Sequence, residues 1–355
     1  MTEEEALQPA PAAPEPISLP PAPVPVPPVV GARALIGTSF ELILRLGDPL
    51  RRASFYVGLI VLGTGGPLAL ALWGSLLVGY EPELLASQTT TAVAGIWIFV
   101  LGFLLAAGII VASIESTGVS IALLGGELSG RPVTIRQAVQ GSRTVFWSIV
   151  VATLLVNIPT TFVQQLIGQT TEASFVAGLI VGTLIQTPFV YAAAGIVLGG
   201  VGPIEALKRS VRIARARKIA ALILAILPSV YGLLILVAFS AGIDLAARAI
   251  EALGLGMDSG PAGVAVLTVL IVMVTFALGT LLFTATAIIY APQVVMFVGL
   301  TRATMGLDRV RAGGDHDPDH HGPERQRFRW LTRPMLLGFA LGALGLAGFL
   351  ATIGS

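Results

Sequence analysis

Long uninterrupted apolar segments are the feature of this 355-residue chain that most restricts its fold. The segments run 19 to 37 residues, and a helix of about 20 apolar residues crosses the hydrocarbon core of a bilayer. In hydrocarbon the backbone must satisfy its own hydrogen bonds, which leaves α-helices or closed barrels, and the segments lack the two-residue alternation of barrel strands. Only 12% of the residues are charged, against about 25% in soluble domains. We therefore expect an all-α polytopic transmembrane helix bundle.

Positive charge in the connecting segments indicates how the bundle is oriented, because cytoplasmic loops carry excess Lys and Arg. The apolar block at 263–299 fits either one overlong helix or two short helices broken near Pro292. Basic and non-basic connections alternate at every crossing if this block is one span. We therefore predict a six-helix core plus one C-terminal helix, with the N-terminus cytoplasmic. The expected spans are 55–78, 91–124, 146–167, 173–198, 219–241, 263–299 and 335–353.

The chain divides into four parts by composition. Residues 1–30 hold ten of the 23 prolines together with several glutamates, which predicts a disordered cytoplasmic tail with polyproline II character. Residues 31–311 form the six-span membrane domain. A hydrophilic linker at 312–333 leads to the C-terminal transmembrane helix at 334–355. The basic residues are almost all arginine, which together with the bias toward Ala, Gly, Val and Leu indicates a prokaryotic source and hence the cytoplasmic (inner) membrane.

Two basic loops resemble each other and suggest an internal repeat. Each copy has an apolar span, a double glycine at 125–126 or 199–200, a short amphipathic segment and a further span. We call the two amphipathic segments, which contain residues 138–142 and 206–210, the basic elbows. An amphipathic helix with basic residues on its polar face lies in the headgroup plane of the bilayer. The elbows either set the topology of the protein and anchor it at the bilayer surface, or they form a specific site for anionic lipid headgroups. The candidate headgroup residues are Arg136, Arg143, Lys208, Arg209, Arg212 and Arg215.

Three features carry a resemblance to a known group of proteins. They are an amphipathic helix at 33–46, the Ala-Leu-Lys-Arg-Ser segment at 206–210, and a final core helix with Tyr290 that runs into Leu-Thr-Arg at 300–302 and Gly-Leu-Asp at 306–308. Over residues 31–311 the chain resembles the membrane domain of prokaryotic glycerophosphodiester phosphodiesterases and related uncharacterised six-helix membrane proteins. The resemblance implies the fold and a link to lipids. The phosphodiesterase catalytic barrel is absent, so it implies no hydrolytic activity and no catalytic residue.

Cysteine and histidine, on which many catalytic and metal sites depend, are missing from the predicted spans. There is no cysteine, and all three histidines, His316, His320 and His321, lie in the linker. They have metal-ligand chemistry but neighbouring glycines and prolines instead of a rigid scaffold, which favours a solvated tract over a metal site. No phosphate-binding loop, dinucleotide pattern or nucleophile elbow occurs. We expect no enzymatic activity and no cofactor.

Polar residues inside the predicted spans are the remaining candidates for function. Glu115 is either a carboxylate paired with a basic elbow or part of a proton or cation relay. Asn157, Gln164 and Gln186 either join helices by hydrogen bonds or line a cavity between broken helices.

Two functions are compatible with these features. The first is a non-enzymatic membrane protein that binds or organises lipids, anionic ones above all, or partner membrane proteins. The alternative is a small-solute transporter or channel that uses the polar residues of spans two to four. Small residues that allow close helix packing predict a contact with this bundle, another membrane protein or a second copy. They are Gly338, Gly342 and Gly345. A net charge of +1 gives no indication of nucleic-acid binding.

Overall fold

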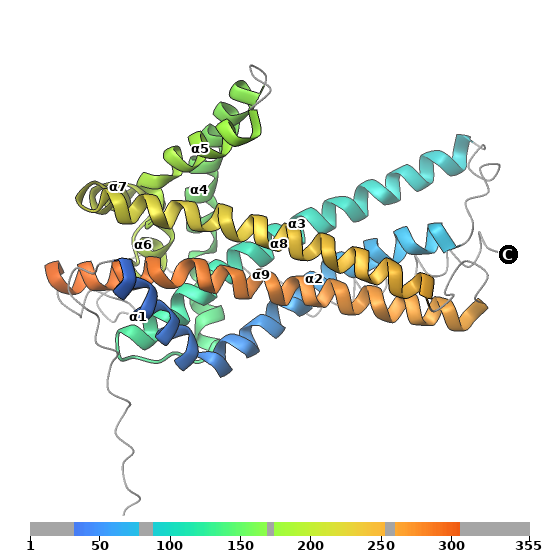
Figure 1. Ribbon diagram of the computed structural model, residues 1–355, viewed down its shortest axis with the longest axis horizontal. Coiled ribbons are helices and arrows are strands. Elements are labelled where there is room, and N and C mark those ends of the chain that lie inside the picture. The colour runs from blue at the N-terminus through green and yellow to red at the C-terminus, as the bar shows by residue number, and fades with distance from the viewer. Residues whose placement is uncertain (1–31, 78–87, 169–173, 253–259, 306–355) are drawn as a thin grey trace, which may run out of the picture.

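The computed structural model describes residues 32–77, 88–168, 174–252 and 260–305, and within these ranges it contains helices and no strands (Figure 1). The first helices in chain order are α1 (Ala32–Arg45), α2 (Gly47–Leu77), α3 (Gln88–Leu128) and α4 (Ile135–Gly168). They are followed by α5 (Ser174–Gln186), the 3₁₀ turn η1 (Thr187–Phe189), α6 (Ala192–Gly199), α7 (Pro203–Ala216), α8 (Lys218–Ala252) and α9 (Gly260–Met305).

Four segments of the described helices are long and apolar enough to cross a membrane, or five if α7 and α8 count as one bent span. Large apolar side chains such as Phe103, Ile158 and Leu233 lie exposed on the long helices. Soluble proteins rarely leave apolar surface of this extent uncovered, so the chain has the character of a multi-pass membrane protein. The four segments are Ala106–Leu128, Ile135–Ile167, Ala177–Gly199 and Val272–Leu300.

The predicted spans match the helices to different degrees. The ambiguous block at 263–299 forms one continuous helix, α9, with Pro292 inside it. The span expected at 173–198 contains a local break, since α5 ends at Gln186 and α6 begins at Ala192, yet Ala177–Gly199 still counts as one candidate span. Pro188 lies in the interruption and has no N–H to continue a helix. The tail at 1–30, the linker at 312–333 and the C-terminal helix at 334–355, with its three packing glycines, lie outside the described residues.

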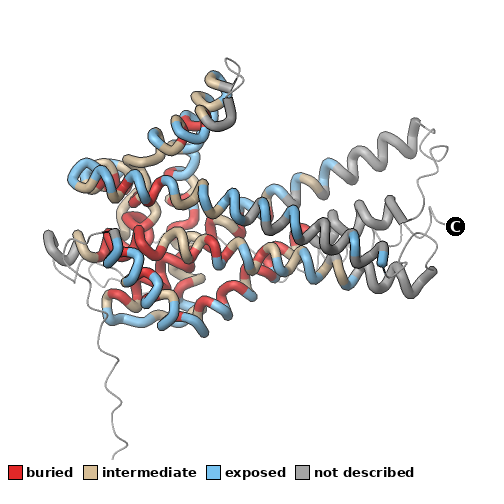
Figure 2. Tube along the Cα trace, viewed as in Figure 1, coloured by how far each residue is buried: buried red, intermediate tan, exposed pale blue. Residues whose placement is uncertain are grey.

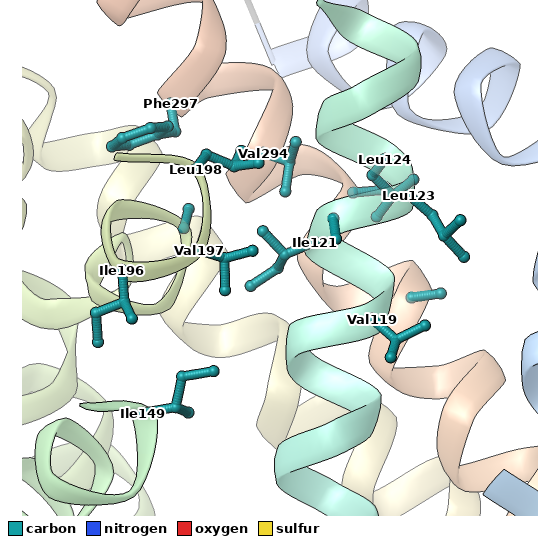
Figure 3. Close-up of a cluster of buried hydrophobic side chains, with 14 of the residues drawn as sticks. Val119, Ile121, Leu123, Leu124, Ile149, Ile196, Val197, Leu198, Val294 and Phe297 are labelled. Atoms are coloured by element: carbon teal, nitrogen blue, oxygen red, sulfur yellow. The ribbon is translucent and has the colours of Figure 1, made fainter. Parts of the chain in front are cut away.

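Among the residues whose burial is described, the buried ones gather where α3 meets α1, α6 and α9 (Figure 2). Helix α3 is the central element and also packs against α2 and α4. Its side chains Ile121 and Leu124 are fully buried, and Figure 3 shows them near Leu198 of α6 and Val294 of α9. Away from this region, α4 and α5 form a hairpin that leaves the body in a different direction from α2, α3, α8 and α9 (Figure 1).

The two expected elbows have different structures. In the first, the chain turns at Gly130 (φ 72°), and α4 then runs without interruption from Ile135, so no separate short helix forms. Thr134 and Gln137 cap its start by reciprocal hydrogen bonds, a capping box. In the second, Gly200 (φ 60°) ends α6, and α7 follows as a distinct helix with Pro203 in its first turn. Only the second elbow therefore has the expected form.

Helix α7 docks on the protein through a face that is rotated from the predicted apolar stripe and shares Ala214 with it. The sequence places Ile204, Leu207, Val211 and Ala214 on one stripe, yet Ile204 is 62% exposed. The buried positions are Ala206, Ser210 and Ala214 at four-residue spacing. Small side chains let α7 approach η1 and α6 closely, which leaves the larger apolar side chain on the outside.

Candidate functional site

An apolar groove of about 750 Å³ lies between α1 and the start of α8, with α9 as its floor. The amphipathic helix expected at 33–46 is present as α1, and Leu42 on one side of it is buried in the core, as is Leu46 just after its end. Ile36 and Phe40 on another side are more than half exposed and line the groove. We call this feature the basic groove because of the residues at its rim. Its lining comprises Leu35, Ile36, Ser39, Phe40, Ile43, Arg215, Ala216, Arg217, Lys218, Ile219, Ala220, Ile223, Leu224, Leu227, Tyr231, Ile288 and Pro292.

Cations reach the rim because the chain bends by 118° between α7 and α8. The bend occurs at Arg217, whose backbone N–H still donates to the carbonyls of Ile213 and Ala214 and so closes the end of α7. It places Arg215, Arg217 and Lys218 together against the apolar walls. Of these three, sequence reasoning nominated only Arg215. The charge run at 215–218 was visible, but the bend that gathers it at a groove was not.

The other nominated basic residues lie elsewhere. Lys208 and Arg212 are exposed on α7, and Arg136 is exposed near the start of α4; none of them lines the groove. Arg209 donates from Nε to Glu205 Oε1 at 3.0 Å, and this hydrogen bond holds the pKa of the Glu205 carboxyl below its ordinary value.

Arg143 belongs to a buried ion-pair cluster with Glu115 and Tyr56. Its Nε donates to Glu115 Oε1 at 3.0 Å, its Nη2 donates to the Tyr56 hydroxyl at 2.8 Å, and that hydroxyl donates to Glu115 Oε2 at 2.5 Å. Glu115 is fully buried, and the cluster ties α2, α3 and α4 together. Of the two roles left open for Glu115, the structure shows pairing with a basic residue of the first elbow region. The sequence had no signal that Tyr56 would complete the cluster.

A second, polar cavity of about 350 Å³ lies where the α4–α5 hairpin diverges from α8 and α9. Asn157 and Gln186, both nominated from the sequence, line it together with Tyr290 and Gln293 of α9. Gln164 does not line it, since its Nε2 donates to the Gly178 carbonyl at 3.1 Å and joins α4 to α5. Sequence reasoning missed Gln293, although its place beside Pro292 in an apolar block was visible.

Ser210 of the second elbow forms hydrogen bonds with backbone groups in the break between α5 and α6. Its Oγ donates to the Pro188 carbonyl at 2.8 Å and accepts from the Tyr191 N–H at 3.0 Å. Both backbone groups would otherwise lack partners in a buried place, which costs about 1–3 kcal/mol per group. The serine of the Ala-Leu-Lys-Arg-Ser segment therefore holds α7 against the broken span.

Replacing Ser210 by alanine is expected to lower the free energy of unfolding by about 1–3 kcal/mol, because it removes both hydrogen bonds. Ser142 of the first elbow is the matched control. It is fully buried, and its Oγ has no hydrogen-bond partner within the described part of the chain. Ser142→Ala should therefore leave stability unchanged or raise it, because it removes a buried hydroxyl that has no partner. Unfolding titrations in mixed micelles compare the two, and equal effects would contradict the bridging role.

The weak metal candidates His316, His320 and His321 lie outside the described residues.

Comparison with known proteins assigns no family or function to the chain. No protein-family model, curated protein or solved structure matches the chain. Its function is therefore inferred from the groove, the cavity and the cluster themselves.

Proposed function

We propose that this protein is a non-enzymatic multi-pass membrane protein that binds an anionic phospholipid in the basic groove. The observation that carries the proposal is the arrangement of three cations, Arg215, Arg217 and Lys218, at the rim of an apolar groove. An apolar wall accepts an acyl chain, and the cations attract the phosphate group. The groove volume of about 750 Å³ is within the range of about 300–1,000 Å³ that is usual for ligand pockets.

The expected topology supports a site in the cytoplasmic leaflet. In a six-span core with a cytoplasmic N-terminus, α1 and the elbow at 203–218 lie on the inner side, where anionic lipids attract Lys and Arg by about 1 kcal/mol each. We propose in addition that the protein lies in a prokaryotic inner membrane and that it is related to the membrane domain of glycerophosphodiester phosphodiesterases. The 118° bend supports an α7 that does not continue α8 across the bilayer.

The test is a lipid titration of the purified full-length chain by native mass spectrometry, with phosphatidylglycerol and phosphatidylcholine as the two probes. We expect the wild-type protein to prefer phosphatidylglycerol. The triple variant Arg215→Gln, Arg217→Gln, Lys218→Gln should bind it on the order of a hundredfold more weakly, at about 1 kcal/mol per charge.

The matched control removes three charges from α7 without touching the groove. Lys208→Gln, Arg209→Gln, Arg212→Gln alters residues that do not line it, and should reduce the lipid preference much less than the groove variant does. Equal losses in both triple variants would mean that the protein attracts anionic lipid by diffuse charge alone. Equal binding of the two lipids by wild type would remove the proposal, and would be expected if residues 306–355 or a second copy filled the groove.

A further inference from the structure

The polar cavity lies beside the break between α5 and α6, and α8 has a proline at the same place. Helix α5 ends at Gln186, and the following turn carries Pro188. Pro228 of α8 lines the same cavity. Interrupted helices at membrane depth are tolerated where the freed backbone is satisfied by protein or lines a cavity, and transporters place their binding sites at such points.

The lining is mostly apolar and contains no charged side chain. Its polar residues are Thr153, Asn157, Gln186, Tyr290 and Gln293, of which Tyr290 already shares a side-chain hydrogen bond with Thr117. The Glu115 carboxylate is not among the lining residues, because it faces Arg143 and Tyr56. Burying an unpaired ion is far more costly than burying a neutral polar group, so this cavity suits a ligand without net charge.

One group in the cavity has an unmet hydrogen-bonding capacity. Gln293 is only 3% exposed, and its Oε1 has no hydrogen-bond partner within the described residues. A buried acceptor left in this state costs about 1–3 kcal/mol, which a donor from a bound molecule removes. The Gln293 Oε1 atom can therefore accept a hydrogen bond from an O–H or N–H group of a molecule bound in the cavity.

We propose that the polar cavity binds a small uncharged solute that carries hydroxyl or amide donors. Gln293 Oε1 accepts a hydrogen bond from the solute, and Asn157 and Gln186 on the opposite helices supply further donors and acceptors. The apolar remainder of the wall fits a short carbon skeleton. This site is separate from the basic groove, which takes its cations from the α7–α8 bend.

Saturation-transfer NMR on the full-length protein in nanodiscs tests the proposal with defined probes. Glycerol and acetamide represent the proposed class, and acetate matches acetamide in size while carrying a charge. We expect saturation transfer to glycerol or acetamide and none to acetate above the level of empty nanodiscs. Gln293→Leu should weaken binding of the neutral probe roughly tenfold, since one buried hydrogen bond is lost.

Gln164→Leu is the matched control, because Gln164 is a glutamine within a helix that bonds to Gly178 outside the cavity. It should keep the neutral-probe affinity of the wild-type protein. Three results would overturn the proposal: equal signals from Gln293→Leu and wild type, preference for acetate, or no transfer above empty nanodiscs. The last result would mean that water alone fills the cavity. Thermal unfolding of each variant establishes that it is folded, so that a lost signal reports on the cavity.

Discussion

Replacing Arg143 by methionine is expected to lower the free energy of unfolding by about 3–5 kcal/mol, the usual cost of leaving one member of a buried ion pair alone. Glu115 is fully buried and, among the described residues, would keep the Tyr56 hydroxyl as its one side-chain partner. The loss is expected to appear as a large shift of the midpoint in an SDS unfolding titration in mixed micelles. Because the cluster joins α2, α3 and α4, packing of all three helices should weaken together.

A second substitution separates the ion pair from the packing of the arginine chain. Glu115→Gln combined with Arg143→Met removes both charges and keeps an amide for the Tyr56 hydroxyl, so it should recover most of the lost stability. An exposed pair provides the control. Arg209 and Glu205 have side chains 36% and 47% exposed, and Arg209→Met should cost no more than about 1 kcal/mol. A double variant as unstable as Arg143→Met would show that the charge pair is not the cause.

The second large effect is expected at the crossing of α2 and α9. A Cβ atom on Gly279 would lie 2.6 Å from the Cα of Gly58 and 2.9 Å from Cβ of Val61. The obstructing atoms include backbone, so the helices themselves must separate. Gly279→Ala should therefore destabilise the protein by about 1–3 kcal/mol or more, as overpacking does elsewhere. Unfolding titrations measure the loss.

Gly63 of α2 is the control for this substitution. A Cβ atom there would meet no other atom within 4 Å, so Gly63→Ala adds helix propensity without a clash. It should leave stability unchanged or raise it by up to about 1 kcal/mol. If Gly279→Ala proved as harmless as Gly63→Ala, the close approach of α2 and α9 would not contribute to folding. Small residues drive helix association in membranes because they allow backbones to approach.

Much of the helical layout follows from local properties of the sequence. The apolar blocks predicted helices over most of their length, and α9 forms one helix as charge alternation required. The amphipathic pattern at 33–46 predicted α1. The segment predicted as one span at 173–198 matches the candidate span Ala177–Gly199, and Pro188 lies just after the end of α5 within it. These features depend on residues within one or two helical turns, which a single sequence displays directly.

The functional surfaces depended on contacts between distant segments. The sequence showed basic residues in both elbows. It did not show that the bend between α7 and α8 brings Arg215, Arg217 and Lys218 together at an apolar groove. Small-residue packing was expected among Gly338, Gly342 and Gly345, which lie outside the described residues. The close crossing that the structure describes uses Gly58 and Gly279 instead.

The sequence by itself determined a helical membrane protein with basic connections, because hydropathy and charge belong to each segment separately. Only the tertiary structure decided which polar groups meet. Tyr56 and Glu115 are 59 residues apart, and Arg143 is a further 28 along the chain. Ser210 reaches back 22 residues to the Pro188 carbonyl. Such pairings form because a polar group buried among helices must find a partner wherever packing brings one, and no local pattern records that choice.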